Sequence, residues 1–403
     1  MNVKNRLLDT IKPRLHIIYP QPHSINQKIN HYAKISVLNS SPDSNRFSNP
    51  ITENTPPSKA KIQVALMLDT SSSMDGLIDQ AKSQLWKMVN ELATAKQNNQ
   101  VPDIEIALYE YGNDGLNGRE GYIRLIANLT TDLDKISEDL FALKTNGGSE
   151  YCGWVIKDGT NQLEWDTKDE VLKIIFIAGN EPFDQGSVDY RVSCKAAIEK
   201  GIIINTIYCG GYQEGINSKW QDGAFLAEGK YFNIDTDIKA VHIPTPYDTT
   251  IIRLNKELNN TYIGYNKSAV AYKVRQTTQD ANAASMSVGN MRERASFKAK
   301  KQYNNASWDL VDAYEADDEI LSEVEEDALP PEWQNLSKPA LDAKINKLKA
   351  KRTDILTQIS AIEKLARKFE DDVKKNTPAE ENTLDKAMMK AIKSQAKLKN
   401  FQF

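Results

Sequence analysis

The sequence predicts an α/β protein: a doubly wound, mostly parallel sheet followed by a helical, coiled-coil-like C-terminal region. Nearly continuous apolar runs, typical of strands buried on both faces, alternate with amphipathic stretches of helical spacing over residues 61–235. Beyond residue 235 glycine becomes scarce and long helical patterns dominate. The expected parts are an N-terminal extension and linker (1–60), the sheet domain (61–240), a helical region with an acidic segment (241–335) and a coiled-coil-like helical hairpin (336–403).

Composition excludes several classes of protein. The net charge of -4 gives no overall positive field, so no nucleic-acid partner is expected. No apolar run approaches the ~20 residues that span a bilayer. The first 30 residues lack the apolar stretch of a secretory signal, which favours a cytoplasmic location, with an exported form as the alternative. The cysteines at 152, 194 and 209 match neither a disulfide framework nor a zinc motif, and buried free thiols are expected.

The elements before and within the sheet domain follow from local patterns. Two short strands are expected at 14–20 and 31–38, followed by a linker rich in Ser, Asn and Pro at 39–60. Apolar runs, helical spacing and glycine turns then predict the sheet domain. Its expected elements, in order, are a strand at 61–68, a helix at 76–96, a hairpin of strands at 103–111 and 122–126, a helix at 131–143, a strand at 171–177, a helix at 188–200, a strand at 202–208, a helix at 216–227 and a short strand at 231–234.

The first strand ends in a group of oxygen-bearing side chains. Its apolar run stops at Asp69, and Ser71 and Ser73 alternate after it, so one tight loop can turn all three side chains toward one point. The carboxyl end of a buried strand is where open α/β sheets place their ligand sites. A carboxylate with two hydroxyls suits a hard divalent cation, Mg²⁺ first and Mn²⁺ or Ca²⁺ as alternatives, rather than zinc. The competing interpretation is a turn that only caps the following helix.

Asp69-Thr70-Ser71-Ser72-Ser73 resembles the Asp-x-Ser-x-Ser start of the metal ion-dependent adhesion site (MIDAS) in von Willebrand factor A-type (VWA) domains. The order of elements over 61–235 is similar to the same family, and the further motifs Gly-Gly-x-Glu-Tyr-Cys-Gly and Ala-Gly-Asn-Glu-Pro-Phe resemble a bacterial branch of it. The resemblance implies a second metal loop at 146–150, in which Ser149 stands for the family's threonine.

The third metal loop departs from the family pattern. The family has an aspartate where this chain has Gly179. Glu181, two residues on, is the expected substitute, and the alternative is a tight turn with no ligand. Because the charge of the ligands tunes the affinity of hard-cation sites, the missing aspartate predicts weak binding, which Gly179→Asp would strengthen.

The C-terminal region shows a heptad seam. Leu341, Leu348, Ile355, Ile362 and Phe369 recur every seven residues, with a second apolar position four residues later that only Arg352 interrupts. An antiparallel hairpin with the helix at 384–398 is the favoured partner arrangement, and dimerisation is the alternative.

Charge is also unevenly distributed in this region. Residues 309–332 are acidic without Lys or Arg, whereas the chain after 337 is basic. This predicts either an acidic segment folded back on a basic helix or two separately solvated faces.

These observations predict a non-enzymatic, metal-dependent protein-binding module. The ion would bind a carboxylate from a partner's Asp or Glu, and the tail would add a second contact surface or self-associate. One alternative is a structural or assembly protein that acts through its helical tail without metal. A second is a Rossmann-like hydrolase with Asp69 as nucleophile, which is disfavoured because Ser71 stands where such phosphatases have a second aspartate.

Overall fold

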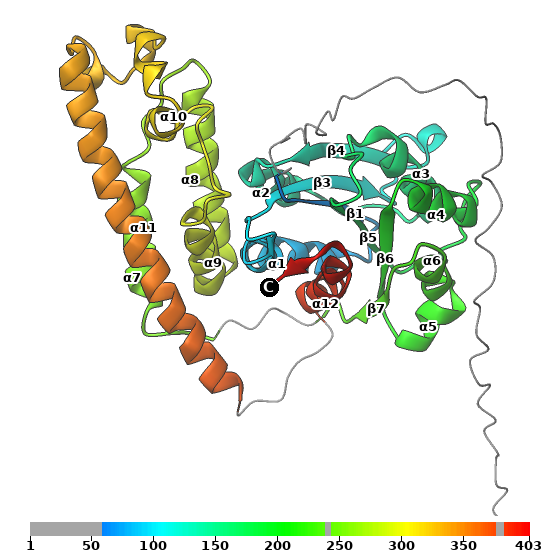
Figure 1. Ribbon diagram of the computed structural model, residues 1–403. Coiled ribbons are helices and arrows are strands. Elements are labelled where there is room, and N and C mark those ends of the chain that lie inside the picture. Colours follow the sequence, from blue (N-terminus) through cyan, green and yellow to red (C-terminus); the bar gives the residue numbers. More distant parts are fainter. Residues whose placement is uncertain (1–58, 238–242, 376–382) are drawn as a thin grey trace, which may run out of the picture. The chain divides into compact units, whose positions relative to one another are not determined.

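The computed structural model describes residues 59–237, 243–375 and 383–403 (Figure 1). The two short strands and the linker predicted before residue 59 lie outside these ranges. Within them, the predicted mostly parallel sheet is confirmed: six strands in the order β4-β3-β1-β5-β6-β7, with β4 as the one antiparallel member. The strands are β1 (Lys61–Asp69), β3 (Asp103–Tyr111), β4 (Ile123–Thr130), β5 (Leu172–Gly179), β6 (Ile202–Cys209) and β7 (Tyr231–Ile234).

Helices cover both faces of this sheet. Strand β1 shows why: Ile62, Val64, Leu66 and Leu68 enter the core on one face, and Ala65 and Met67 enter the core on the other. A strand buried on both faces carries apolar residues throughout, which is the pattern seen in the sequence. The helices of the first face are α1 (Asp75–Leu92), α2 (Leu133–Ala142) and α12 (Leu384–Ala396), and those of the second are α3 (Cys152–Gln162), α4 (Tyr190–Glu199) and α6 (Trp220–Leu226). The short helix α5 (Tyr212–Asn217) packs beside α6.

Two helices differ from the sequence prediction. Helix α3 was not predicted, because its glycines and polar residues weaken the apolar period. The helix predicted at 216–227 is two helices, broken at Lys219, whose φ of 72° is left-handed. The break lets the buried Trp220 donate its indole N–H to the Glu181 carbonyl at 2.8 Å.

A helical region (residues 243–375) lies between β7 and α12 in the chain. It contains α7 (Asp248–Asn259), α8 (Ala269–Met286), α9 (Val288–Lys298), α10 (Leu310–Ala316) and α11 (Lys338–Lys374). Its core joins Ile251, Leu254 and Leu258 of α7 to Ile355 and Ile359 of α11. No helix in the described ranges is both long and apolar enough to cross a membrane.

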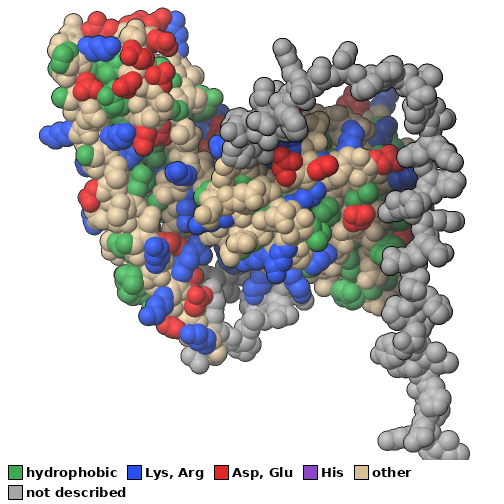
Figure 2. Space-filling model, viewed as in Figure 1, with side chains coloured by type: hydrophobic (Ala, Val, Ile, Leu, Met, Phe, Trp, Pro, Cys, Tyr) green, Lys and Arg blue, Asp and Glu red, His purple; other side chains and the backbone are tan. Residues whose placement is uncertain are grey.

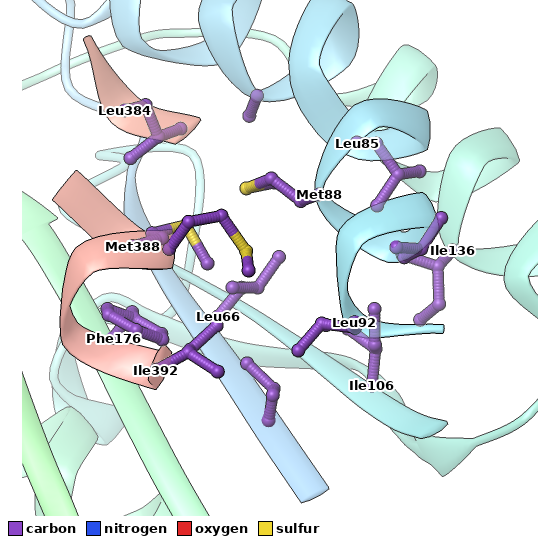
Figure 3. Close-up of a cluster of buried hydrophobic side chains, with 14 of the residues drawn as sticks. Leu66, Leu85, Met88, Leu92, Ile106, Ile136, Phe176, Leu384, Met388 and Ile392 are labelled. Atoms are coloured by element: carbon purple, nitrogen blue, oxygen red, sulfur yellow. The ribbon is translucent and has the colours of Figure 1, made fainter. Parts of the chain in front are cut away.

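The predicted hairpin of α11 with the last helix is wrong. The apolar seam of α11 packs on α7, α9 and α10, whereas α12 packs on α1 and on the sheet. Figure 3 shows Met388 and Ile392 of α12 among Leu66, Met88 and Phe176. The seam is buried or half-buried from Leu341 to Ala366, whereas Phe369 and Val373 at its end are exposed. An apolar stripe does not specify its partner. The sheet domain is therefore residues 59–237 together with α12, with the helical region inserted before its last helix.

Arg352, the residue that interrupts the apolar seam, lies in a buried ion-pair site. Arg352 contacts Asp309 at 2.6 Å and Asp312 at 2.5 Å, and its Nε donates to the Thr261 hydroxyl at 2.9 Å. Two carboxylates of the acidic segment thus meet one cation of the basic helix. This agrees with the interpretation in which the acidic segment folds back on that helix.

Candidate metal centre

The centre lies where three loops meet at the carboxyl ends of β1, β3 and β5. The first loop follows β1 and carries Ser71 and Ser73. Its backbone is fixed to the end of β3, because the Thr70 N–H donates to the Tyr111 carbonyl at 2.8 Å. It is fixed to the loop at 146–150 as well: Ser72 N–H donates to the Gly147 carbonyl at 3.0 Å, and Asn146 N–H donates to the Thr70 carbonyl at 2.9 Å.

Asp69 is the buried carboxylate of the centre. Its Oδ1 accepts a hydrogen bond from the Ser71 backbone N–H at 2.7 Å, an Asx turn that begins the loop. Its Oδ2 is fully buried and accepts no hydrogen bond from an N–H or hydroxyl group of the described residues, while the Glu150 carboxyl group lies within hydrogen-bonding reach of Asp69. Buried carboxylate oxygens are normally satisfied, so this oxygen is suited to an ion.

Glu150 is the second carboxylate of the centre. Gly112, at φ +82°, lets the two acids approach: a Cβ there would lie 2.6 Å from Asp69 Oδ1 and 2.8 Å from Glu150 Cγ. Burial, reinforced by Glu150, raises the pKa of Asp69 well above its ordinary value. Burial likewise raises the pKa of Glu150. Two adjacent buried carboxylates repel each other, and a divalent cation between them would remove that cost.

Polar side chains complete the group. The hydroxyls of Ser71 and Ser73 lie 3.3 Å apart, and Asn180 Nδ2 donates to Ser73 Oγ at 3.2 Å. The Asn180 Oδ1 is buried without a partner among the described residues. The group contains only two carboxylates, and the described residues include no cluster of three or more His, Cys, Asp or Glu side chains placed to hold a metal. Carboxylates, hydroxyls and an amide oxygen together are the ligand types of Mg²⁺ or Ca²⁺.

The structure thus brings Asp69, Ser71 and Ser73 together, as the sequence suggested, and places the other two predicted ligands differently. Ser149 pairs through its backbone with Gly112, and its hydroxyl makes no hydrogen bond within the described ranges. Glu181 donates its backbone N–H to Glu150 Oε2 at 3.3 Å. The side chain of Glu150, not that of Ser149, lies against Asp69.

Sequence reasoning missed Glu150 and Asn180 as candidate ligands. Both belong to the two motifs that resemble the bacterial branch of the family, where they follow Ser149 and Gly179 respectively. An acidic residue directly after the Gly-Gly-Ser loop was the available signal. The family pattern instead predicts the ligand at the hydroxyl position, Ser149.

Similar proteins are found among solved structures only. No protein-family model matches the chain, and no curated protein is significantly similar to it. Among solved structures, the SpRpn10 VWA domain is 13% identical, with 44% of this chain and 90% of that chain covered and a TM-score of 0.34. BatB, a conserved hypothetical protein from Bacteroides thetaiotaomicron, is 15% identical, with 43% and 90% covered and a TM-score of 0.33. The pilus adhesin SpaC from Lactobacillus rhamnosus GG is 14% identical, with 44% and 28% covered and a TM-score of 0.34.

Proposed function

We propose that the VWA-like sheet domain is a protein-binding module that depends on a divalent cation. Asp69 and Glu150 would hold the ion, with the hydroxyls of Ser71 and Ser73 and the amide oxygen of Asn180 as neutral ligands. Mg²⁺ is the first candidate, and Mn²⁺ or Ca²⁺ would suit the same oxygen ligands. The observation that carries the proposal is the buried Oδ2 of Asp69, which accepts no hydrogen bond from an N–H or hydroxyl group of the described residues, beside a second buried carboxyl group.

A partner protein would supply the next ligand. Ser73 is exposed at the mouth of the centre, so one side of the ion would face solvent and an incoming side chain. A carboxylate from a partner's Asp or Glu is the ligand that a hard cation favours there. The loops at 113–120 and 181–187 surround the centre and would select the partner, as exposed loops on a rigid scaffold commonly do.

Calorimetric titration of the full chain with Mg²⁺ and Mn²⁺ tests the ion site. Binding is expected in the natural chain and absent in Asp69→Asn and in Glu150→Gln, which keep the shape of each side chain and remove its charge. Glu120→Gln is the matched control, because Glu120 is an exposed acid on a neighbouring loop. Equal affinity in Glu150→Gln would remove Glu150 from the ligand set, and no binding by the natural chain would refute the ion site.

The coordination position that a partner carboxylate would fill can be tested separately. Water-proton relaxation with bound Mn²⁺ should report at least one rapidly exchanging water, and an acidic partner peptide should displace it. An ion without exchangeable water would contradict the proposed partner carboxylate.

Two other functions are less supported. A structural role through the helical region would be favoured if the metal titration showed no binding. A hydrolase with Asp69 as nucleophile has little geometric support, because the Asp69 side chain is fully buried and its Oδ1 is engaged by Ser71.

A further inference from the structure

A groove of about 1150 Å³ lies on the sheet domain, between α6, the edge strand β7 and the C-terminal helix α12. None of the proposed ion ligands lines it. Two lysines one helical turn apart, Lys386 and Lys390, border it from α12, while Tyr231 borders it from β7 and Lys230 from the position just before that strand. Figure 2 shows Lys and Arg side chains gathered over α12.

The charge of the groove is strongly positive. Its lining includes five cations against one acid, Asp222, which already accepts a hydrogen bond from the Tyr190 hydroxyl. Four of the cations are exposed lysines that form no ion pair with any described residue, namely Lys219, Lys230, Lys386 and Lys390. The fifth, Arg191, is more than half exposed and contacts Asp189 at 3.5 Å. Unpaired charges of one sign around a concave surface attract ligands of the opposite sign.

Strand β7 offers unpaired backbone groups to this groove. It is the last strand of the sheet and pairs only with β6 within the described ranges. The carbonyls of Lys230 and Ile234 accept hydrogen bonds from Thr206 and Gly210, so they face β6. Because alternate residues of a strand direct their N–H and C=O groups to opposite edges, those of Tyr231 and Asn233 face away from β6. An unpaired edge of this kind can accept one more strand.

An apolar anchor stands in the same groove. The Phe225 side chain is 81% exposed, and the Tyr212 side chain is 52% exposed. Exposed aromatic side chains in a groove rimmed by charge are typical of binding sites for partner proteins.

We propose that this groove binds an extended acidic peptide segment of a partner protein, added as a strand to the free edge of β7. The peptide's Asp and Glu side chains would meet the lysines of α12 and of residues 219–230, and one apolar side chain would cover Phe225. A nucleic acid would also meet the positive charge, but it would leave the N–H and C=O groups of the β7 edge unpaired. The observed combination of a strand edge with the lysines favours a peptide.

Fluorescence anisotropy with the full chain and synthetic peptides tests the proposal. The probe peptide alternates Glu with Val or Thr and contains one Phe. It should bind in the presence of EDTA, because the groove does not use the Asp69 centre. A peptide with Lys in place of Glu should not bind, and one N-methylated at alternate residues should bind much more weakly, since it cannot pair along a strand edge. Equal binding of either control peptide would overturn the proposal, and so would binding that EDTA abolishes.

Substitutions in the groove provide the matching variants. The double variant Lys386→Glu/Lys390→Glu should lower the affinity for the probe peptide by about tenfold or more. Lys347→Glu with Lys351→Glu, an exposed pair of the same spacing on α11, should leave its affinity unchanged. An oligonucleotide that binds more tightly than the peptide would overturn the proposal, as would self-association of the free chain that only the groove variant abolishes.

Discussion

Arg294 of α9 donates a hydrogen bond from Nη1 to Asp134 Oδ1 of α2 at 2.6 Å, and both side chains are buried. The same guanidinium contacts Asp280 of α8 through Nε, and its Nη2 donates to the Gln276 carbonyl at 2.9 Å. The guanidinium also lies over the Trp86 ring, 4.6 Å from its centroid. This one side chain therefore joins the helical region to the sheet domain with its charge neutralised by two carboxylates.

Replacing Arg294 should be costly. Arg294→Met leaves the buried Asp134 without its cation and leaves Asp280 with Lys298 alone, and a loss of roughly 3–5 kcal/mol in the free energy of unfolding is expected. Urea denaturation measures it. Arg253→Met is the control, because Arg253 and Glu257 form an exposed pair whose loss should cost about 1 kcal/mol or less. An Arg294→Met chain as stable as the control would show that the buried contacts do not hold the two parts together.

The last helix should be essential to the sheet domain. Ile392 of α12 is fully buried in the core that Figure 3 shows, so Ile392→Ala should cost roughly 2–5 kcal/mol by opening a cavity. Leu398→Ala should change stability by no more than about 0.5 kcal/mol, because Leu398 is 75% exposed. Thermal and urea unfolding of both variants check this. Similar losses in the two would indicate that α12 does not pack on the sheet.

The sequence predicted the sheet well because its signals are local. The apolar run of β1 and its end at Asp69 are visible in consecutive residues, and so is the turn that brings Ser71 beside Asp69. The partner of α12 was not visible, because an apolar stripe shows that a face is buried and not what buries it. Glu150 stood next to the predicted metal loop in the sequence, but its approach to Asp69 depends on how separate loops meet in space.

Gly179→Asp should destabilise the sheet domain rather than strengthen ion binding, the reverse of the expectation from sequence. A Cβ at residue 179 would lie 2.5 Å from the Tyr111 hydroxyl and 3.1 Å from Asp69 Oδ2. The Tyr111 hydroxyl is buried and donates to the Ala178 carbonyl at 2.9 Å, so it has little freedom to move. A lower melting temperature with no gain in Mg²⁺ affinity is the expected result.

Gly148→Asp is the matched control for that substitution. A Cβ at Gly148 would have no heavy atom of the described residues within 4 Å, so this chain should melt near the natural temperature. A Gly179→Asp chain of normal stability and tighter Mg²⁺ binding would restore the sequence-based expectation and place residue 179 at the ion.

Lys298 should make stability depend on pH above neutrality. Its ammonium group is buried in α9, where it donates to Asn259 Oδ1 and lies 3.2 Å from Asp280 Oδ2. Burial lowers the pKa of Lys298 to about 8, with the charge of Arg294 acting in the same direction, while Asp280 and Asp134 oppose the shift. The ordinary value for lysine in the unfolded chain is 10.5.

Lys298 binds fewer protons in the folded chain than in the unfolded chain above pH 8. Between pH 8 and 10.5 the unfolded chain holds a proton on Lys298 that the folded chain has lost, so this group makes the folded state more stable as pH rises through that window. One group contributes at most about 1.4 kcal/mol per pH unit. Below pH 8 both states hold the proton, and the slope from this group vanishes.

Urea unfolding of the natural chain and of Lys298→Met across that window isolates the effect, because tyrosines and other lysines titrate in both. The difference in unfolding free energy should change with pH, in the sense that the natural chain gains on the variant as pH rises toward 10.5. Lys256→Met, at an exposed lysine of α7, is the control: its unfolding free energy should change with pH in parallel with that of the natural chain. Parallel curves for Lys298→Met would mean that Lys298 keeps its proton in the folded chain, with Asp280 compensating for its burial.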